Sequence, residues 1–178
     1  MAAVGYPVVA SGATAMATID TAATTDFDGG AVMVGPNGSV LGIFDQSGMV
    51  NGQAGAAFLP SDLVLGVTGQ LASTGRVAHG WLDVVGTDAL PPVAGVTTTV
   101  GQTTGPVGAL VQQVASTGPA SSHLQPGDVI LAVNGQPVRS IAELRSRLYV
   151  LSAGTPVRLS VERAGAHVTV VLDLSASP

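Results

Sequence analysis

Short apolar runs interrupted by glycine, proline and Asn-Gly steps are the feature that most constrains what this chain can fold into. Glycine accounts for 24 of the 178 residues, well above the usual share of about 7%, and it follows no collagen-like period. The runs are rich in valine, leucine and isoleucine, and turn residues bound them. Runs of this kind are typical of short β-strands joined by tight turns. The sequence therefore predicts a mainly β fold.

The composition excludes several classes of protein. Hydrophobic residues make up 46% of the chain and charged residues only 10%, which is too apolar for an intrinsically disordered chain. Six arginines, no lysine, 3% aromatic residues and a net charge of −5 do not suit a nucleic-acid binder. The absence of cysteine excludes disulfides, thiolate zinc sites and thiol nucleophiles, and it leaves the cellular compartment open.

Membrane and targeting segments are not predicted either. No apolar run reaches the roughly 18 residues that a membrane-spanning helix needs. The apolar N-terminus lacks a basic segment and is interrupted by proline and glycine. We therefore expect strand there rather than a signal peptide.

The first part of the chain predicts strands and one hairpin. Short strands are expected within residues 4–20, at 31–34 and at 40–44. The turn signal at residues 36–38, Pro-Asn-Gly, joins the last two strands into a hairpin. Residues 46–55 are rich in glycine, and we expect a loop there.

A helix of about three turns is predicted after this loop. Ser61 is its candidate N-cap, because a serine hydroxyl accepts from the free N–H groups of a first turn. Leu63, Val67 and Leu71 recur every fourth residue and indicate one apolar face. Gly75 marks the expected C-terminal stop.

The second part predicts a strand-rich unit with one capped helix. The segment 125–138 reads as a strand, an Asn-Gly turn and a short strand, and residues 89–105 read as a long loop. Ser140 and Glu143 form a capping box for a helix over residues 141–150. Four further strands are expected, at residues 81–85, 108–114, 157–162 and 168–174.

The sequence of this second part resembles a known family. Residues 124–138, Leu-Gln-Pro-Gly-Asp-Val-Ile-Leu-Ala-Val-Asn-Gly-Gln-Pro-Val, resemble the G-L-x-x-G-D-v-I-x-x-v-N/D-G-x-x-V run of PDZ domains. The helix and the strand at 154–163 follow at the family's spacing. Residues 75–84 resemble the G-K/R-V-x-R-G-[W/Y]-L-G-V entry of PDZ domains in HtrA-type serine proteases. The resemblance covers about residues 76–174 and implies a PDZ α/β domain.

A peptide-binding site follows from this resemblance. PDZ domains bind an extended C-terminal peptide as an added strand and hold its carboxylate with backbone N–H groups. The resemblance assigns this role to residues of the domain entry and of the helix: Trp81, Leu82, Asp83, Val84, Ile141, Leu144, Arg145 and Leu148. The apolar helix residues among them either line the pocket for the last side chain or pack the domain core.

Asp83 departs from the family pattern, which has glycine at this position. A carboxylate there is expected to face the carboxylate site, where repulsion would cost on the order of 1–3 kcal/mol. Capture of a C-terminus, binding of an internal segment and a blocked groove therefore all stay open.

The first part resembles the end of a trypsin-like protease domain of the same HtrA-type family. Residues 19–43 align without a gap to the pattern x-T-D-A-x-I-x-x-G-x-S-G-G-x-L-x-x-x-x-G-x-V-x-G-I, and residues 60–63 match the segment before that domain's closing helix. The resemblance places Asp28 at the nucleophilic serine and Asp26 at the preceding glycine of the oxyanion loop. It implies a partial trypsin-like β-barrel.

These positions predict a chain without protease activity. A carboxylate cannot replace the serine hydroxyl in acyl transfer. The family's histidine partner precedes the serine, whereas His79, His123 and His167 all follow Asp28. Asp26 and Asp28 alone do not make a metal site, so we expect no metal and no cofactor.

We therefore expect a truncated, catalytically inactive relative of HtrA-type serine proteases, with partial β-barrel at 1–58, helix and linker at 59–79, and PDZ domain at 80–178. The predicted function is binding of peptides or protein C-termini. Homo-oligomers and an active protease homologue are the other expected partners, and neither nucleic acid nor a membrane span is expected. Two alternatives remain: a serine endopeptidase fragment whose catalytic half is supplied elsewhere, and a structural protein with a blocked groove.

Overall fold

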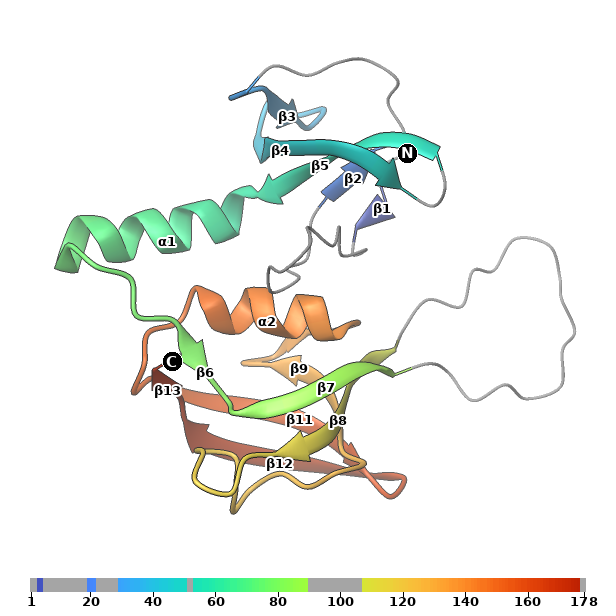
Figure 1. Ribbon diagram of the computed structural model, residues 1–178, viewed down its shortest axis with the longest axis vertical. Coiled ribbons are helices and arrows are strands. Elements are labelled where there is room, and N and C mark those ends of the chain that lie inside the picture. The colour runs from blue at the N-terminus through green and yellow to red at the C-terminus, as the bar shows by residue number, and fades with distance from the viewer. Residues whose placement is uncertain (1–2, 5–18, 22–28, 51–52, 90–106, 177–178) are drawn as a thin grey trace, which may run out of the picture.

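Two large antiparallel sheets, a smaller two-stranded sheet and two helices form the described part of the computed structural model, residues 3–4, 19–21, 29–50, 53–89 and 107–176 (Figure 1). The first sheet is open and has the strand order β1-β2-β5-β4-β3. Its strands are β1 Ala3–Val4, β2 Ile19–Thr21, β3 Val32–Val34, β4 Val40–Val50 and β5 Gln53–Pro60. The predicted hairpin corresponds to β3 and β4. The β-rich fold is thus confirmed, and the described strands of the first sheet do not close into a barrel.

The loop predicted at 46–55 is wrong, because β4 and β5 run through it as a long hairpin. Ser47 pairs with Ala56, and Gly48 pairs with Gly55. Glycine, alanine and serine provide no apolar alternation that would reveal a strand from sequence. The pairing register of the two strands defines them instead, with Phe44 packed edge-on against Phe58 at a centroid distance of 5.8 Å.

Helix α1, Ser61–Thr74, follows β5 directly. The predicted N-cap is wrong: Pro60 occupies that position, and Ser61 is already helical. The C-terminal stop is confirmed, since Gly75 has φ 71° and donates its N–H to the Leu71 carbonyl over 2.9 Å. Leu63 is buried at the end of α1 next to β5, whereas Leu71 is exposed. Val67 between them is half-buried, so the burial of the predicted apolar face decreases along the helix.

The second sheet has the order β12-β11-β9-β8-β7, with β10 paired to β9. Its strands are β7 Val84–Ala89, β8 Gly108–Val114, β9 Val129–Val133, β10 Gln136–Pro137, β11 Pro156–Arg163 and β12 Ala166–Asp173. A separate pair joins β6, Gly80–Trp81, to β13, Ser175–Ala176. The strand predicted at 81–85 is therefore split at Leu82 and Asp83. The loop predicted at 89–105 falls mostly outside the described residues.

The predicted Asn-Gly turn and the predicted Ser140 cap are confirmed in this part. Asn134 and Gly135 both have positive φ, 51° and 79°, in a two-residue turn between β9 and β10. Helix α2, Ile141–Tyr149, begins after Ser140, whose Oγ accepts from the Glu143 N–H over 3.0 Å. The Glu143 carboxylate reaches back to the Arg139 N–H over 2.9 Å, one residue before the usual partner in a capping box.

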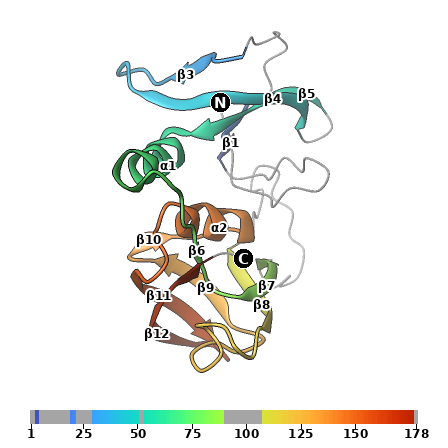
Figure 2. The same ribbon diagram turned by 60° about the vertical axis from the view of Figure 1, so that its left-hand side comes forward.

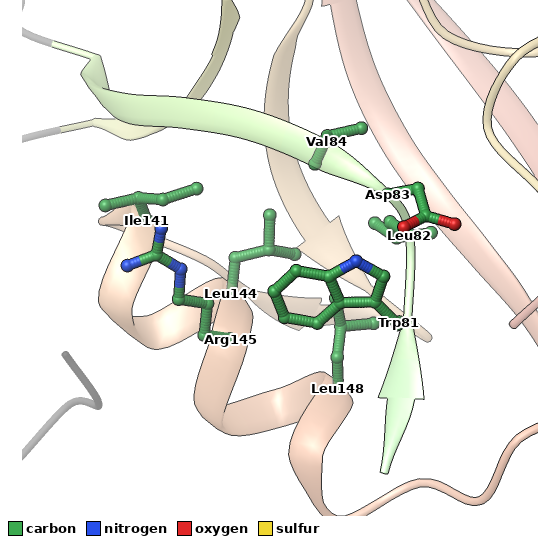
Figure 3. A pocket seen from close by; sticks show the side chains of 8 residues that line it. All are labelled: Trp81, Leu82, Asp83, Val84, Ile141, Leu144, Arg145 and Leu148. Carbon is green, nitrogen blue, oxygen red and sulfur yellow. The ribbon is translucent and has the colours of Figure 1, made fainter. Parts of the chain in front are cut away.

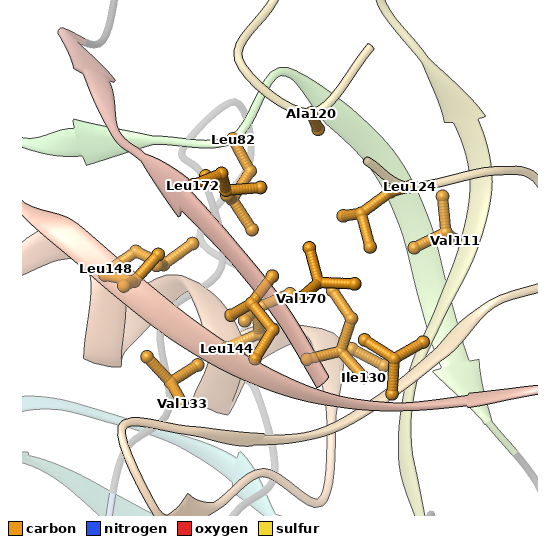
Figure 4. Packing of buried hydrophobic residues seen from close by; sticks show 14 of the residues in the cluster. Leu82, Val111, Ala120, Leu124, Ile130, Val133, Leu144, Leu148, Val170 and Leu172 are labelled. Atoms are coloured by element: carbon orange, nitrogen blue, oxygen red, sulfur yellow. The ribbon is translucent and has the colours of Figure 1, made fainter. Parts of the chain in front are cut away.

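The main hydrophobic core lies between the second sheet and α2 (Figure 4). Its members come from residues 82–174, and Ile130, Leu159 and Val161 have no exposed surface. At the edge of this core lies the Asp128 carboxylate, fully buried and paired with Arg163 over 2.8 Å.

Helix α1 lies between the first sheet and α2 (Figures 1 and 2). Gly66 permits the close approach of the helices, because a Cβ at this position would sit 2.6 Å from the Val150 Cβ. The Gln70 amide donates to the Val150 carbonyl over 3.0 Å. Neither α1 nor α2 has the length and apolar character that crossing a membrane requires.

Candidate functional site: a groove between β7 and α2

Strand β7 has one open edge, and this edge faces α2. In the described part of the chain, β7 pairs only with β8, so its other row of backbone N–H and C=O groups has no neighbouring strand. Helix α2 forms the opposite wall (Figure 3). An unpaired strand edge beside a helix is a place where a further strand can bind.

A shallow pocket that is open to solvent lies between these walls. We call it the groove, and its lining residues are Trp81, Leu82, Asp83, Val84, Ile141, Leu144, Arg145 and Leu148. The structure thus brings together all the residues that the sequence assigned to a peptide site. Their binding of a peptide stays a prediction.

The base of the groove is continuous with the hydrophobic core. Leu82 and Leu144 are each 1% exposed and Leu148 is 5% exposed, and all three belong to the core cluster. The two roles weighed for the apolar helix residues are therefore combined, because these side chains pack the core and line the groove. Trp81 is half-buried and lies beside them (Figure 3). The groove accordingly offers an apolar surface.

The segment between β6 and β7 presents free backbone donors. In the described structure, the N–H groups of Leu82 and Asp83 have no hydrogen-bond acceptor. Asp83 has φ 56°, in the left-handed region that glycine adopts easily and aspartate tolerates better than most residues. Its carbonyl accepts from the Ala115 N–H over 2.9 Å, which holds the segment in place. Two adjacent free N–H groups suit a carboxylate.

The Asp83 carboxylate was expected to face the carboxylate site, but in the structure it points toward other groups. Its carboxylate lies against Gly118, where an added Cβ would sit 2.8 Å from Oδ2. The Ser175 hydroxyl donates to the same oxygen over 3.4 Å. In Figure 3 the carboxylate lies at the start of β7, at the end of the groove away from Ile141. The residue thus supplies the positive φ of a glycine while its charge is drawn toward Ser175.

A hydrogen bond ties the other end of the groove. The Ile141 N–H, the first of α2, donates to Asp88 Oδ1 on β7 over 2.8 Å. Nearby, Gly86 comes so close to α2 that an added Cβ would sit 3.0 Å from Ile141 Cδ1. Asp88 was missed by sequence reasoning, because it is 53 residues from its partner and no local motif connects them.

Among the groups considered for catalysis, His79 and His123 lie outside the groove. Asp26 and Asp28 fall outside the described residues. His79 stacks on Tyr149 with ring centroids 3.2 Å apart, and its Nδ1 lies 3.0 Å from the Tyr149 carbonyl. His123 is exposed, with Nδ1 3.0 Å from Ser122 Oγ, and no carboxylate in the described part of the chain binds this imidazole.

Metal coordination gains no support from the described ranges, which contain no group of three His, Asp or Glu side chains able to hold an ion. The Asp128 carboxylate already has hydrogen-bond partners within the protein. Burial raises the pKa of this carboxyl, but hydrogen bonds from Arg163 and the Gln125 N–H, with the Arg163 charge, outweigh burial and hold the pKa below its usual value.

Known proteins resemble this chain in sequence and fold. A family model described as a PDZ domain matches residues 85–174. A probable periplasmic serine endoprotease DegP-like from Pseudomonas putida is 37% identical over 158 residues, covering 84% of this chain and 31% of the relative. The periplasmic serine endoprotease DegP of Escherichia coli is 31% identical over 153 residues, covering 83% and 31%.

Among solved structures, the HtrA-type protease AlgW with a tripeptide has a TM-score of 0.53 and 25% identity, covering 99% of this chain and 64% of that one. The same protease with a decapeptide has a TM-score of 0.53 at 23% identity and supports the fold alone. The chain spans about a third of the length of the curated relatives it matches.

Proposed function

The chain belongs to the PDZ-domain family and is of the HtrA type, and from this premise we propose that it binds peptides or protein C-termini by strand addition and has no protease activity of its own. The observation that carries this proposal is the open edge of β7, which begins at the free N–H groups of Leu82 and Asp83. An extended ligand antiparallel to β7 would continue the sheet and bring its terminal carboxylate to these donors.

The apolar groove supports a preference for an apolar last residue. Leu82, Leu144 and Leu148 line the groove beside the free N–H groups, so the last side chain of a ligand would enter apolar surroundings. Affinity for this mode is on the order of micromolar, about −8 kcal/mol. The structure of the HtrA-type protease AlgW with a tripeptide, which is 25% identical to this chain, supports the proposal.

Fluorescence anisotropy with labelled peptides tests this binding. A hexapeptide ending in leucine with a free carboxylate is compared with its C-terminal amide, and we expect the amide to bind at least tenfold more weakly. Equal affinities would contradict carboxylate capture, and no binding of either peptide would contradict the proposed function.

Two glycine substitutions provide a matched pair for the same assay. Gly118→Ala places a Cβ against the Asp83 side chain and displaces the loop that carries the donors. Gly69→Ala makes the same chemical change on α1, where a Cβ has open space. We expect weaker peptide binding in the first variant only. Equal binding by both would contradict a role for the Asp83 loop.

The proposed lack of catalysis rests on Asp28 at the serine position of the family pattern. Covalent labelling by a fluorophosphonate tests it, first on the chain itself and then on the Asp28→Ser variant. We expect neither protein to be labelled above a denatured control, because a serine without its base is not activated. Labelling of the variant would contradict the proposal.

A second candidate is a serine endopeptidase fragment completed by another chain. The curated relatives favour it, since they are named serine endoproteases and are about three times longer than the matched region. Mixing the chain with an active HtrA-type protease distinguishes the candidates. Fluorophosphonate labelling of the mixture beyond that of the protease alone supports the fragment, whereas binding without additional labelling supports the peptide-binding function.

A further inference from the structure

Arg145 is a cation on the wall of the groove that lacks a partner within the described residues. It lies on α2, is half-buried, and makes neither an ion pair nor a hydrogen bond there. Arg147, two residues later, is engaged: it pairs with Glu143 over 2.9 Å and donates to the Pro137 carbonyl. A guanidinium that carries five donors and lines a binding groove is suited to an anionic ligand group.

Helix geometry places this guanidinium toward the start of α2. Side chains on a helix lean toward its N-terminus, and Figure 3 shows the guanidinium beside Ile141. Ile141 is also the residue that Asp88 ties to β7. The cation therefore lies at the end of the groove away from the free N–H groups of Leu82 and Asp83.

The spacing of strand and helix identifies which ligand residue meets this cation. If the last side chain lies between Leu144 and Leu148, the third-from-last side chain points to the same face, about 7 Å further along β7. A helix covers that distance in between four and five residues, at about 1.5 Å each. The residue four to five positions before the middle of the pocket on α2 is Ile141. The Arg145 guanidinium lies beside this residue and therefore beside the third-from-last side chain.

We propose that Arg145 selects ligands that carry Asp or Glu as the third-from-last residue. This inference rests on the proposed function and names the class of ligand for the groove. It does not follow from overall charge, because the chain has a net charge of −5 and repels acidic peptides in general. Asp88 adds a carboxylate at the same end, but it accepts from the first N–H of α2, where the helix dipole offsets its charge.

Three peptides test the selection: Ala-Ala-Ala-Glu-Ala-Leu and its Gln and Lys counterparts, all with a free C-terminus. Dissociation constants are measured on the full chain by fluorescence anisotropy at 50 mM and 500 mM salt. We expect the Glu peptide to bind about tenfold more tightly than the Gln peptide at low salt, and the Lys peptide to bind most weakly. The preference should shrink at high salt, since screening weakens the ion pair.

Substitutions connect the preference to this side chain. In Arg145→Gln the Glu and Gln peptides should bind equally, and in Arg145→Glu the Lys peptide should bind best. Arg147→Gln is the control, because it removes an equal charge from the same helix at a residue outside the groove, and it should retain the preference for Glu. Loss of the preference in Arg147→Gln as well would overturn the role of Arg145.

The outcomes separate this inference from the proposed function. Equal binding of the Glu and Gln peptides by the unchanged chain overturns the inference and leaves peptide binding intact. A stronger preference for Glu at the penultimate position than at the third-from-last position overturns the register. Failure of all three peptides and of an all-alanine peptide ending in leucine overturns the proposed function, and this inference with it.

Discussion

Valines on strands of the two sheets have opposite surroundings. Val32 and Val34 on β3 are 51% and 52% exposed, whereas Val157 and Val161 on β11 are 1% and 0% exposed. β11 lies between β9 and β12 and faces the core, whereas β3 is the edge strand of an open sheet. The same residue type forms strands in both places, so strand propensity does not ensure burial. Burial requires a second layer, which the described structure provides for the second sheet.

The largest test of this difference is to separate the two parts. A fragment of residues 76–178 should fold alone, with cooperative thermal unfolding and dispersed amide resonances, because all members of the core cluster lie within 82–174. A fragment of residues 1–75 should not unfold cooperatively, because Val32, Val34 and Val40 in its sheet are exposed. An insoluble or unstructured 76–178 fragment would mean that the first part belongs to the same core.

Truncation of single side chains should repeat the contrast on a smaller scale. Leu159→Ala removes a side chain with 0% exposure and should lower the free energy of unfolding by about 3–4 kcal/mol. Val34→Ala removes a side chain that is half exposed and should change it by less than about 0.5 kcal/mol. Urea denaturation of the full chain measures both values, and similar losses would show that β3 is covered in solution.

The buried ion pair tests the electrostatic part of the second region. Asp128→Asn should cost about 2–3 kcal/mol at pH 7, because the carboxylate accepts from both Arg163 and the Gln125 N–H. The pKa of Asp128 is lower in the folded chain than its ordinary value of 3.8. The stabilisation is therefore complete above that value and disappears as the pH falls through the lowered pKa.

Urea denaturation from pH 7 to pH 3 measures this dependence. Stability should fall with pH more steeply in the unchanged chain than in Asp128→Asn, which has no carboxyl to protonate at this position. Parallel curves for the two proteins would contradict the lowered pKa.

A substitution on β3, the edge strand of the first sheet, should have the smallest effect on stability but should change the association of the chain. Val34→Lys places a charge on β3, and charged residues on edge strands oppose pairing with another chain. We expect the unchanged chain to form a homodimer through its first sheet at low micromolar concentration, and the variant to be monomeric. Light scattering measures this, with Val85→Lys at an exposed residue of β7 as a control. A monomeric unchanged chain would contradict the expectation.

Features set by neighbouring residues were predictable from the sequence. The Asn134-Gly135 turn, the Ser140 cap of α2 and the Gly75 stop of α1 depend on interactions within a few residues. Helical periodicity likewise placed Ile141, Leu144 and Leu148 on one face with Arg145 beside it, and the family resemblance assigned these residues to the groove. These choices are local, so a short segment carries the complete signal.

Other features depend on partners distant in the sequence. The hairpin of β4 and β5 was not predictable from its small residues, because they give no apolar alternation. The pairing register of the two strands defines it. The bond from Ile141 to Asp88 closes one end of the groove across 53 residues.

The residues of the groove were thus determined by the sequence, but the tertiary structure decided which charges face into it. Asp83 has its carboxylate turned toward Ser175, and Arg145 has no partner in the described part of the chain. Whether a charge is paired depends on what the fold brings within a few ångströms of it, and Coulomb energies at this range decide its role. No pattern of neighbouring residues contains that information.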